Sequence, residues 1–235
     1  MRIAVFAYNF PHKKTQDFLF RLFIEQADVA LVLAANPVEL GIPPAAVRMK
    51  VRGGGGLVHP CKISERMGWR YEVVEHNSAR TIELLREERI DAAVISGARI
   101  LKSHVIEAVP KGVINFHPGL LPEGRGLDAM QWAIYEDRPI GVTAHLIDGR
   151  VDAGLVLLKR EIPIQEDDTV FDLSQRLMDV QSDMLPEAID LLGQGTAGLE
   201  SVGRGNLHRK MPPEIEAQIS DRLRARQARM NEAKS

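Results

Sequence analysis

Asn115, His117 and Asp152 carry an amide, an imidazole and a carboxylate that we expect to meet at one edge of a sheet. Asn115 and His117 are two residues apart at the end of an apolar run, residues 112–116, which is typical of a strand. Because side chains alternate along a strand, both project from the same face. Asp152 follows another predicted strand, residues 141–147. Ligands of open parallel sheets bind beyond the carboxyl ends of the strands, so the three groups are candidates for one site.

These three groups suit acyl-type transfer to an amine. Amide and imidazolium N–H groups stabilise a developing oxyanion, and the carboxylate supports the imidazolium and helps to take up the amine proton. The chain has no Ser or Cys in a nucleophile elbow, which favours direct attack by the acceptor over an acyl-enzyme. On residue types alone, a purely structural hydrogen bond between Asn115 and His117 remains an alternative.

A longer motif surrounds these residues. Its parts, in chain order, are NxHPGLLPxxRG from residue 115, GVTxH from residue 141 and VDAG from residue 151. The motif resembles the signature of formyltransferases that use N10-formyltetrahydrofolate, a family that includes glycinamide ribonucleotide, methionyl-tRNA and nucleotide-sugar formyltransferases. The pattern of strands and helices extends this resemblance over residues 1–200.

The resemblance implies that Asn115, His117 and Asp152 form the catalytic trio and that N10-formyltetrahydrofolate is the formyl donor. It places the folate between residues 97–101, residues 120–122 and the loop of residues 148–152. The residues implied to contact the folate are Gly97, Arg99, Ile100, Leu101, Leu120, Leu121, Pro122 and Asp148. No metal is expected, because no two of the seven His residues have the spacing of a helical zinc motif and Cys61 is the only cysteine.

The acceptor is expected to be a small amine. Glycinamide ribonucleotide enzymes carry a Gly and Ser-Asn phosphate loop after the first strand, where this chain reads Phe6 to His12. The tRNA enzymes add a C-terminal barrel, for which the residues after the last long helix are too few. We therefore expect a nucleotide-linked amino sugar whose phosphates meet Lys13, Lys14 or Arg125. The alternatives are glycinamide ribonucleotide, an amino-acid or hydroxylamine acceptor, and hydrolysis of the donor. Hydrolysis is less favoured, because the related hydrolases carry an N-terminal ACT-like domain, whereas the first strand here starts at residue 3.

The elements that must position these residues follow an α/β pattern. Short apolar runs alternate with amphipathic ones, which predicts a Rossmann-like, doubly wound, mostly parallel sheet. The turn-rich loop of residues 148–154 is too short for a helical crossover, so the two strands that flank it form an antiparallel addition. The predicted strands are residues 3–8, 29–35, 71–74, 91–96, 112–116, 141–147, 155–164 and 199–202, and the predicted helices are 17–26, 78–89 and 169–192, the last kinked at Pro186.

Two domains are predicted from this pattern: a catalytic domain over residues 1–200 and a mostly helical extension over residues 201–235. In the last helix, Ile215, Ile219 and Leu223 form an apolar stripe that packs either on the body or on a second subunit, which would make a homodimer. The glycines at 53–56 lack the spacing of a phosphate-binding loop, so we interpret them as a mobile loop.

Composition narrows the class of protein. The chain has 235 residues, 45% hydrophobic and 26% charged, with a formal net charge of -2, as in an ordinary soluble domain. This near-neutral charge argues against nucleic acid or an anionic membrane as partner. No run approaches the length of a membrane span, and the first residues do not form a signal peptide. We therefore expect a cytoplasmic protein.

Overall fold

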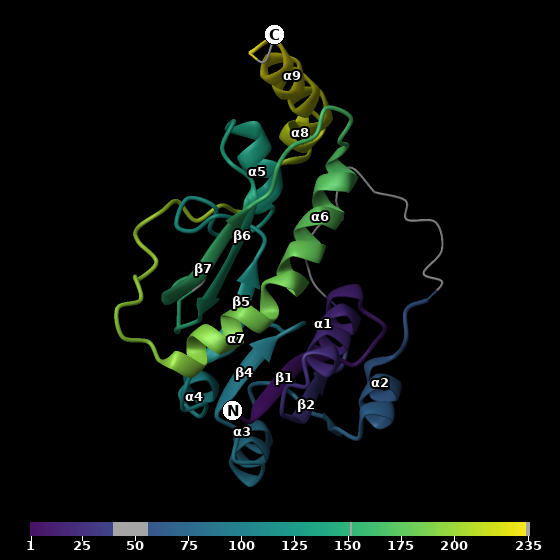
Figure 1. The fold of residues 1–235 in the computed structure, drawn as a ribbon, viewed down its shortest axis with the longest axis vertical. Helices are drawn as coiled ribbons and strands as arrows, with labels where there is room; N and C mark the ends of the chain where they lie inside the picture. The colour runs from purple at the N-terminus through teal and green to yellow at the C-terminus, as the bar shows by residue number, and fades with distance from the viewer. Residues whose placement is uncertain (40–55, 151, 234–235) are drawn as a thin grey trace.

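Seven strands form one sheet in the computed structural model, which describes residues 1–39, 56–150 and 152–233 (Figure 1). The order is β3-β2-β1-β4-β5-β6-β7, with parallel pairing from β3 through β5 and antiparallel pairing of β6 with β5 and with β7. This confirms the predicted doubly wound, mostly parallel sheet with an antiparallel addition. The strands are β1 (Ile3–Tyr8), β2 (Val29–Ala35), β3 (Arg70–Val73), β4 (Ala92–Ile95), β5 (Val113–His117), β6 (Gly141–Leu146) and β7 (Leu155–Glu161).

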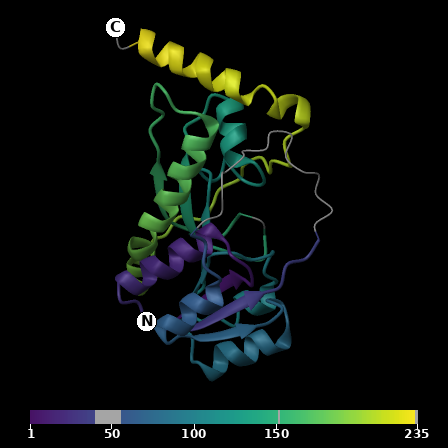
Figure 2. The same cartoon turned by 90° about the vertical axis from the view of Figure 1, so that its right-hand side faces the viewer.

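Helices cover both faces of the sheet (Figures 1 and 2). One face packs against α1, α2, α6 and α7, and the other packs against α3 and α4. The strands of the central part are buried on both faces, which explains why they read as continuous apolar runs in the sequence. The helices are α1 (Lys13–Ile24), α2 (Pro60–Met67), α3 (Ala79–Glu87), α4 (Ser103–Ile106), α5 (Ala129–Tyr135), α6 (Val170–Asp183), α7 (Leu185–Gln194), α8 (Pro213–Glu216) and α9 (Ile219–Glu232).

The helix predicted over residues 169–192 is present, but it divides into α6 and α7 at Met184. Pro186 lacks the N–H group that would bond one turn back, so the break next to it has the predicted cause. Thr169 and Asp172 form a capping box that starts α6. The helix predicted from residue 17 starts earlier, because the His12 side chain accepts a hydrogen bond from the Thr15 amide and caps α1.

The tail of the chain packs onto the body rather than standing apart from it. Ile219 and Leu223 of α9 are buried in the same core as the sheet, at the end of the molecule opposite the N-terminus (Figures 1 and 2). The predicted stripe therefore contacts the body of its own chain. The strand predicted over residues 199–202 is reduced to a bridge between Ser201 and Leu155, because it meets only the first residues of β7.

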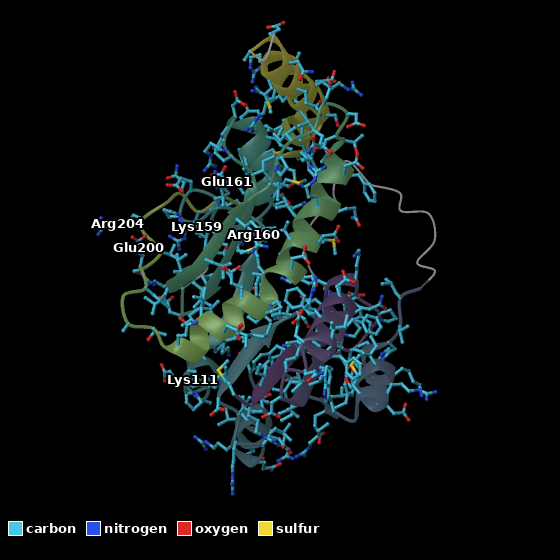
Figure 3. All side chains as sticks on the ribbon, in the orientation of Figure 1. Lys111, Lys159, Arg160, Glu161, Glu200 and Arg204 are labelled. Carbon is cyan, nitrogen blue, oxygen red and sulfur yellow. The ribbon has the colours of Figure 1, made fainter. Side chains whose placement is uncertain are left out.

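Strand β7 forms one edge of the sheet and carries charged residues. Lys159, Arg160 and Glu161 lie along this strand beside the segment that bears Glu200 and Arg204 (Figure 3). Charges on an edge strand disfavour pairing with a strand of another molecule. Predictions made for residues 53–55, 151 and 234 lie outside the described residues. Within the described ranges, no helix has the length and apolarity needed to span a membrane.

Candidate active site

Strand β5 positions Asn115 and His117 at the carboxyl edge of the sheet. Ile114 and Phe116 point into the core on one face, and Val113 belongs to the core on the other. By alternation, Asn115 and His117 therefore share the second face, as the two-residue spacing predicts. The order of the strands reverses between β1 and β4, which makes the crevice above them the place where sheets of this kind bind ligands.

His117 has an oxygen acceptor at each ring nitrogen. Its Nδ1 atom is 3.3 Å from Oδ1 of Asp152, and its Nε2 atom is 2.6 Å from the carbonyl oxygen of Gly124. Only the imidazolium has two N–H groups to donate to both acceptors. The side chain is 6% exposed, so water screens these contacts little. The two acceptors hold the ring in one orientation.

Asp152 is fixed from two sides. One carboxylate oxygen faces His117, and the other accepts a 2.8 Å hydrogen bond from the Gly126 amide. Burial alone would raise the pKa of Asp152, but the hydrogen bond and charge of His117, together with the Gly126 bond, outweigh burial and lower the pKa below its usual value. Asp152 is therefore a carboxylate at neutral pH and supplies the negative charge next to the imidazole.

His145 orients the amide of Asn115. The two residues are opposite each other in the β5–β6 pair, and Nδ2 of Asn115 is 3.3 Å from Nε2 of His145. The other ring nitrogen of His145 is 3.0 Å from the carbonyl oxygen of Ala153. Burial lowers the pKa of His145 to about 4, so its ring is neutral and the Ala153 contact requires the proton on Nδ1. Nε2 then accepts from Asn115, and His145 acts as a positioning residue.

Thr143 holds the turn that follows β5. Its hydroxyl donates to the Gly119 carbonyl oxygen at 2.8 Å and accepts from the Leu121 amide at 3.0 Å. Thr143 is fully buried, so both backbone groups depend on this one hydroxyl for their hydrogen bonds. The same turn leads to Gly124, and Thr143 thereby supports the carbonyl group that faces His117.

Two pockets meet at Asp152 and at the loop of residues 98–100. The smaller pocket, of about 210 Å³, has Asn115 and Asp152 on one side and the apolar side chains of Ile95, Leu101 and Ile147 around them. The larger pocket, of about 1120 Å³, contains His117 and Asp152 and extends from the end of β1 to helix α6 and to residues 207–210. Two ligands that occupied these pockets would meet next to the trio.

The predicted folate contacts divide between different places. Arg99, Ile100, Leu101 and Asp148 line the smaller pocket, together with Asn115. Leu120 lines a separate pocket, and Leu121 is fully buried under Thr143; with Pro122, they do not line the smaller pocket. Gly97 lies against the ring of Tyr8, where an added Cβ would be 2.6 Å from a ring carbon. Only half of these predicted contacts are therefore brought together.

The lysines predicted to meet the phosphates of the acceptor lie outside both pockets. Lys13 pairs with Asp17 at 2.6 Å. The amine of Lys14 donates to the Phe116 carbonyl oxygen at 3.0 Å and lies 5.2 Å from the ring of Phe18. Burial lowers the pKa of Lys14 to about 7. The third predicted residue, Arg125, presents its carbonyl oxygen to the amide of His208.

Sequence reasoning missed the wall of the larger pocket that residues 207–210 form. The only sequence signal is the run of cationic and imidazole side chains, His208-Arg209-Lys210. It also missed the contribution of α6 through Ser174 and Gln181. In the part of the chain that the structure describes, no three His, Cys, Asp or Glu side chains gather as metal ligands would.

Comparison with protein families matches residues 41–189 to the family described as formyl transferase. A methionyl-tRNA formyltransferase of Anaeromyxobacter dehalogenans is 41% identical over 181 residues, which cover 66% of this chain and 58% of that protein. Another, from Thermodesulfovibrio yellowstonii, is 37% identical over 105 residues, covering 44% and 34%. The chain thus spans between about a third and three-fifths of the length of these curated relatives.

Solved structures share the fold. Glycinamide ribonucleotide transformylase 1 from Symbiobacterium toebii has a TM-score of 0.64 and 24% identity, with 87% of this chain and 92% of that chain covered. A sugar N-formyltransferase from Shewanella has a TM-score of 0.64 and 20% identity, with 95% and 87% covered. The formyltransferase PseJ from Anoxybacillus kamchatkensis, solved with a UDP-linked formamido sugar and tetrahydrofolate, has a TM-score of 0.55 and 20% identity, with 89% and 86% covered.

Proposed function

The chain belongs to the formyl transferase family, and from this premise we propose that it moves a formyl group from N10-formyltetrahydrofolate to the primary amine of a small acceptor. The observation that carries the proposal is the position of Asn115, His117 and Asp152 where two pockets of different size join. Direct transfer between two bound molecules needs both of them within reach of the same catalytic groups.

We assign the ring end of the donor to the smaller pocket. Ile100, Leu101 and Ile147 offer apolar contacts to a flat ring system, and Asn115 and Asp152 stand where the pocket meets the larger one. We assign Arg99 and Asp148 to the same pocket. The donor supplies an activated formyl carbon at this junction.

The trio supports the chemistry as follows. The acceptor amine forms a bond to the formyl carbon, and Asn115 and His117 donate to the oxygen that gains negative charge. The bond from that carbon to the folate nitrogen then breaks. The amine loses one proton with the help of the Asp152 carboxylate, and the folate nitrogen gains one, so the number of protons is unchanged. Nε2 of His117 faces Gly124 in the described structure, so donation to a reactant exchanges that hydrogen bond for a new one.

The acceptor that we propose is a nucleotide-linked amino sugar. The volume of the larger pocket, about 1120 Å³, suits a molecule of that size. Two similar solved structures are a sugar N-formyltransferase and a formyltransferase in complex with a UDP-linked formamido sugar, which supports this class. Methionyl-tRNA is the second candidate, because the curated relatives described above act on it by name.

An acceptor screen tests the proposal. Tetrahydrofolate release from N10-formyltetrahydrofolate is followed with nucleotide-linked amino sugars, glycinamide ribonucleotide, N-hydroxylated amino acids, methionyl-tRNA and water alone. We expect formyl transfer to an amino-sugar nucleotide and a loss of about 10²–10³-fold in turnover for Asn115→Ala and His117→Ala. If the donor is cleaved at the same rate with water alone, the reaction is hydrolysis rather than transfer. If correctly folded Asn115→Ala and His117→Ala variants have wild-type turnover, the proposed catalytic role of the trio is wrong.

A further inference from the structure

The segment of residues 207–210 forms a fixed wall of the larger pocket, although it lies far along the chain from the family motif. The His208 amide donates to the Arg125 carbonyl oxygen at 2.9 Å, and the Leu127 amide donates to the His208 carbonyl oxygen at 3.0 Å. His208 and Gly126 thereby form a parallel bridge. The wall is joined to the same loop that gives Asp152 its Gly126 hydrogen bond.

The backbone on both sides of Arg209 is held by hydrogen bonds. The ring of His208 lies 5.0 Å from the ring of Trp132, and the indole N–H of Trp132 donates to the Arg209 carbonyl oxygen at 3.0 Å. The Met211 amide donates to the carboxylate of Asp128 at 2.8 Å. The Arg209 side chain is exposed on this fixed backbone and lines the pocket. A cation presented in this way loses little backbone freedom when it binds a ligand.

Positive charge exceeds negative charge among the side chains that line the larger pocket. Three cationic side chains line the larger pocket, namely Arg99, Arg209 and Lys210, against two carboxylates, Asp128 and Asp152. Asp152 faces His117, and Asp128 is occupied by the Met211 amide and lies 3.8 Å from Lys210. Lys210 is thus a partner of Asp128 as well as a cation of the pocket, and the cationic side chains that line the pocket exceed the carboxylates by one.

Apolar side chains adjoin these cations. Leu127 is 51% exposed and Leu207 is 53% exposed, and both line the larger pocket. Large aliphatic side chains exposed beside cationic ones suit a ligand that combines an apolar or ring portion with an anionic group.

We propose that Arg209 and Lys210 form a subsite for an anionic oxygen group of a reactant, with Leu127 and Leu207 packing on the part of the reactant next to that group. The inference rests on the proposed function and deepens it. Two sources carry this chemistry: the phosphates of the acceptor, and the glutamate carboxylates of the folate. The cations supply charge-assisted hydrogen bonds to either.

Binding of inorganic pyrophosphate tests the subsite without any turnover. Isothermal titration calorimetry at fixed ionic strength compares the wild type, the double variant Arg209→Ala/Lys210→Ala and the control Lys111→Ala/Arg204→Ala. The control removes the same charge from exposed positions outside the pocket (Figure 3). We expect pyrophosphate to bind about 10- to 100-fold more weakly to the first variant and unchanged to the control. No binding to the wild type, or equal losses in both variants, would overturn the subsite.

A second measurement distinguishes the two sources of the anion. Tetrahydrofolate carries the glutamate and 6-methyltetrahydropterin does not. If the Arg209→Ala/Lys210→Ala variant binds tetrahydrofolate more weakly than the wild type but binds 6-methyltetrahydropterin equally well, the subsite belongs to the donor. If its affinity for both of these pterins is unchanged while pyrophosphate binds more weakly, the subsite belongs to the acceptor. Because pyrophosphate binding needs no transfer reaction, a failed acceptor screen would leave this result intact.

Discussion

Replacement of Asp152 by Asn changes the charge next to His117 while preserving the size of the side chain. In the wild type, one carboxylate oxygen faces Nδ1 of His117 and the other accepts from the Gly126 amide. In the variant, the remaining oxygen keeps the Gly126 hydrogen bond, and the new NH₂ group faces His117. Nδ1 must then accept a hydrogen bond, so the ring carries its proton on Nε2, facing Gly124.

The size of the effect follows from these contacts. A hydrogen bond to a charged group contributes roughly 1.5–3 kcal/mol, and each 1.4 kcal/mol is about tenfold in rate, so turnover falls by about 10- to 100-fold. The pKa of Asp152 is lowered by folding, so its carboxylate stabilises the fold above about pH 3.8 and this contribution is lost as the pH falls through the lower folded value. The variant is therefore less stable than the wild type at pH 7, and the difference shrinks below pH 4.

Three measurements check this prediction. Formyl transfer gives the turnover, ¹⁵N NMR of the His117 ring reports its protonation, and urea denaturation at pH 7 and pH 3.5 gives the free energy of unfolding. Asp221→Asn, which alters an exposed carboxylate on α9, serves as the matched control. Wild-type turnover in a folded Asp152→Asn variant, or a proton on Nδ1 of His117 in that variant, would refute the reasoning.

Three further predictions concern stability. Lys14→Met raises the free energy of unfolding most at pH 7 and below, and this gain decreases as the pH rises from about 7 toward 10.5. The reason is that burial lowers the pKa of Lys14, so at low pH the wild type buries an amine that is protonated in the unfolded chain. A constant difference between the two proteins in urea denaturation across this pH range would contradict the prediction. Gly126→Ala lowers the free energy of unfolding by more than about 2 kcal/mol, because at a φ of +98° the new Cβ would be 2.1 Å from the His208 carbonyl oxygen. The control Gly198→Ala, also at positive φ but with open space around it, carries only the backbone strain of roughly 1–2 kcal/mol. Equal melting temperatures of the two variants would argue against the clash. Thr143→Val costs about 1–3 kcal/mol for each backbone group that it leaves without a hydrogen bond, whereas the exposed Thr196→Val changes calorimetric stability little, and similar values for both would rule out the role of the hydroxyl.

The strands were readable from the sequence because burial on both faces leaves a continuous apolar run. β1 and β2 have the predicted bounds, and β5 ends one residue later than predicted, at His117. Helices α2, α4 and α5 were missed. α5 is short, and the residue before it, Asp128, has a φ of +53° and forms no side-chain capping bond, so the helix lacks the usual signal of a helix start.

The candidate site was predictable only in part. Alternation along β5 placed Asn115 and His117 on one face, the position of Asp152 after the next predicted strand made it a candidate for the same site, and the resemblance to a family implied that the three act together. The contact of His117 with Gly124 and the wall of residues 207–210 depend on how a loop turns back and which distant segment covers it. Periodicity and propensity describe neighbours along the chain, so they contain no information about such contacts.

The bridge between Gly126 and His208 bears on the order in which the protein matures during synthesis. His208 contacts Arg125 across 83 residues of sequence, so the loop that faces His117 and Asp152 is made long before its partner leaves the ribosome. Until then the Arg125 carbonyl oxygen and the Leu127 amide have no His208 to bond. A nascent chain can therefore assemble its central strands early, while the pocket beside His117 closes only after residue 208 has been added.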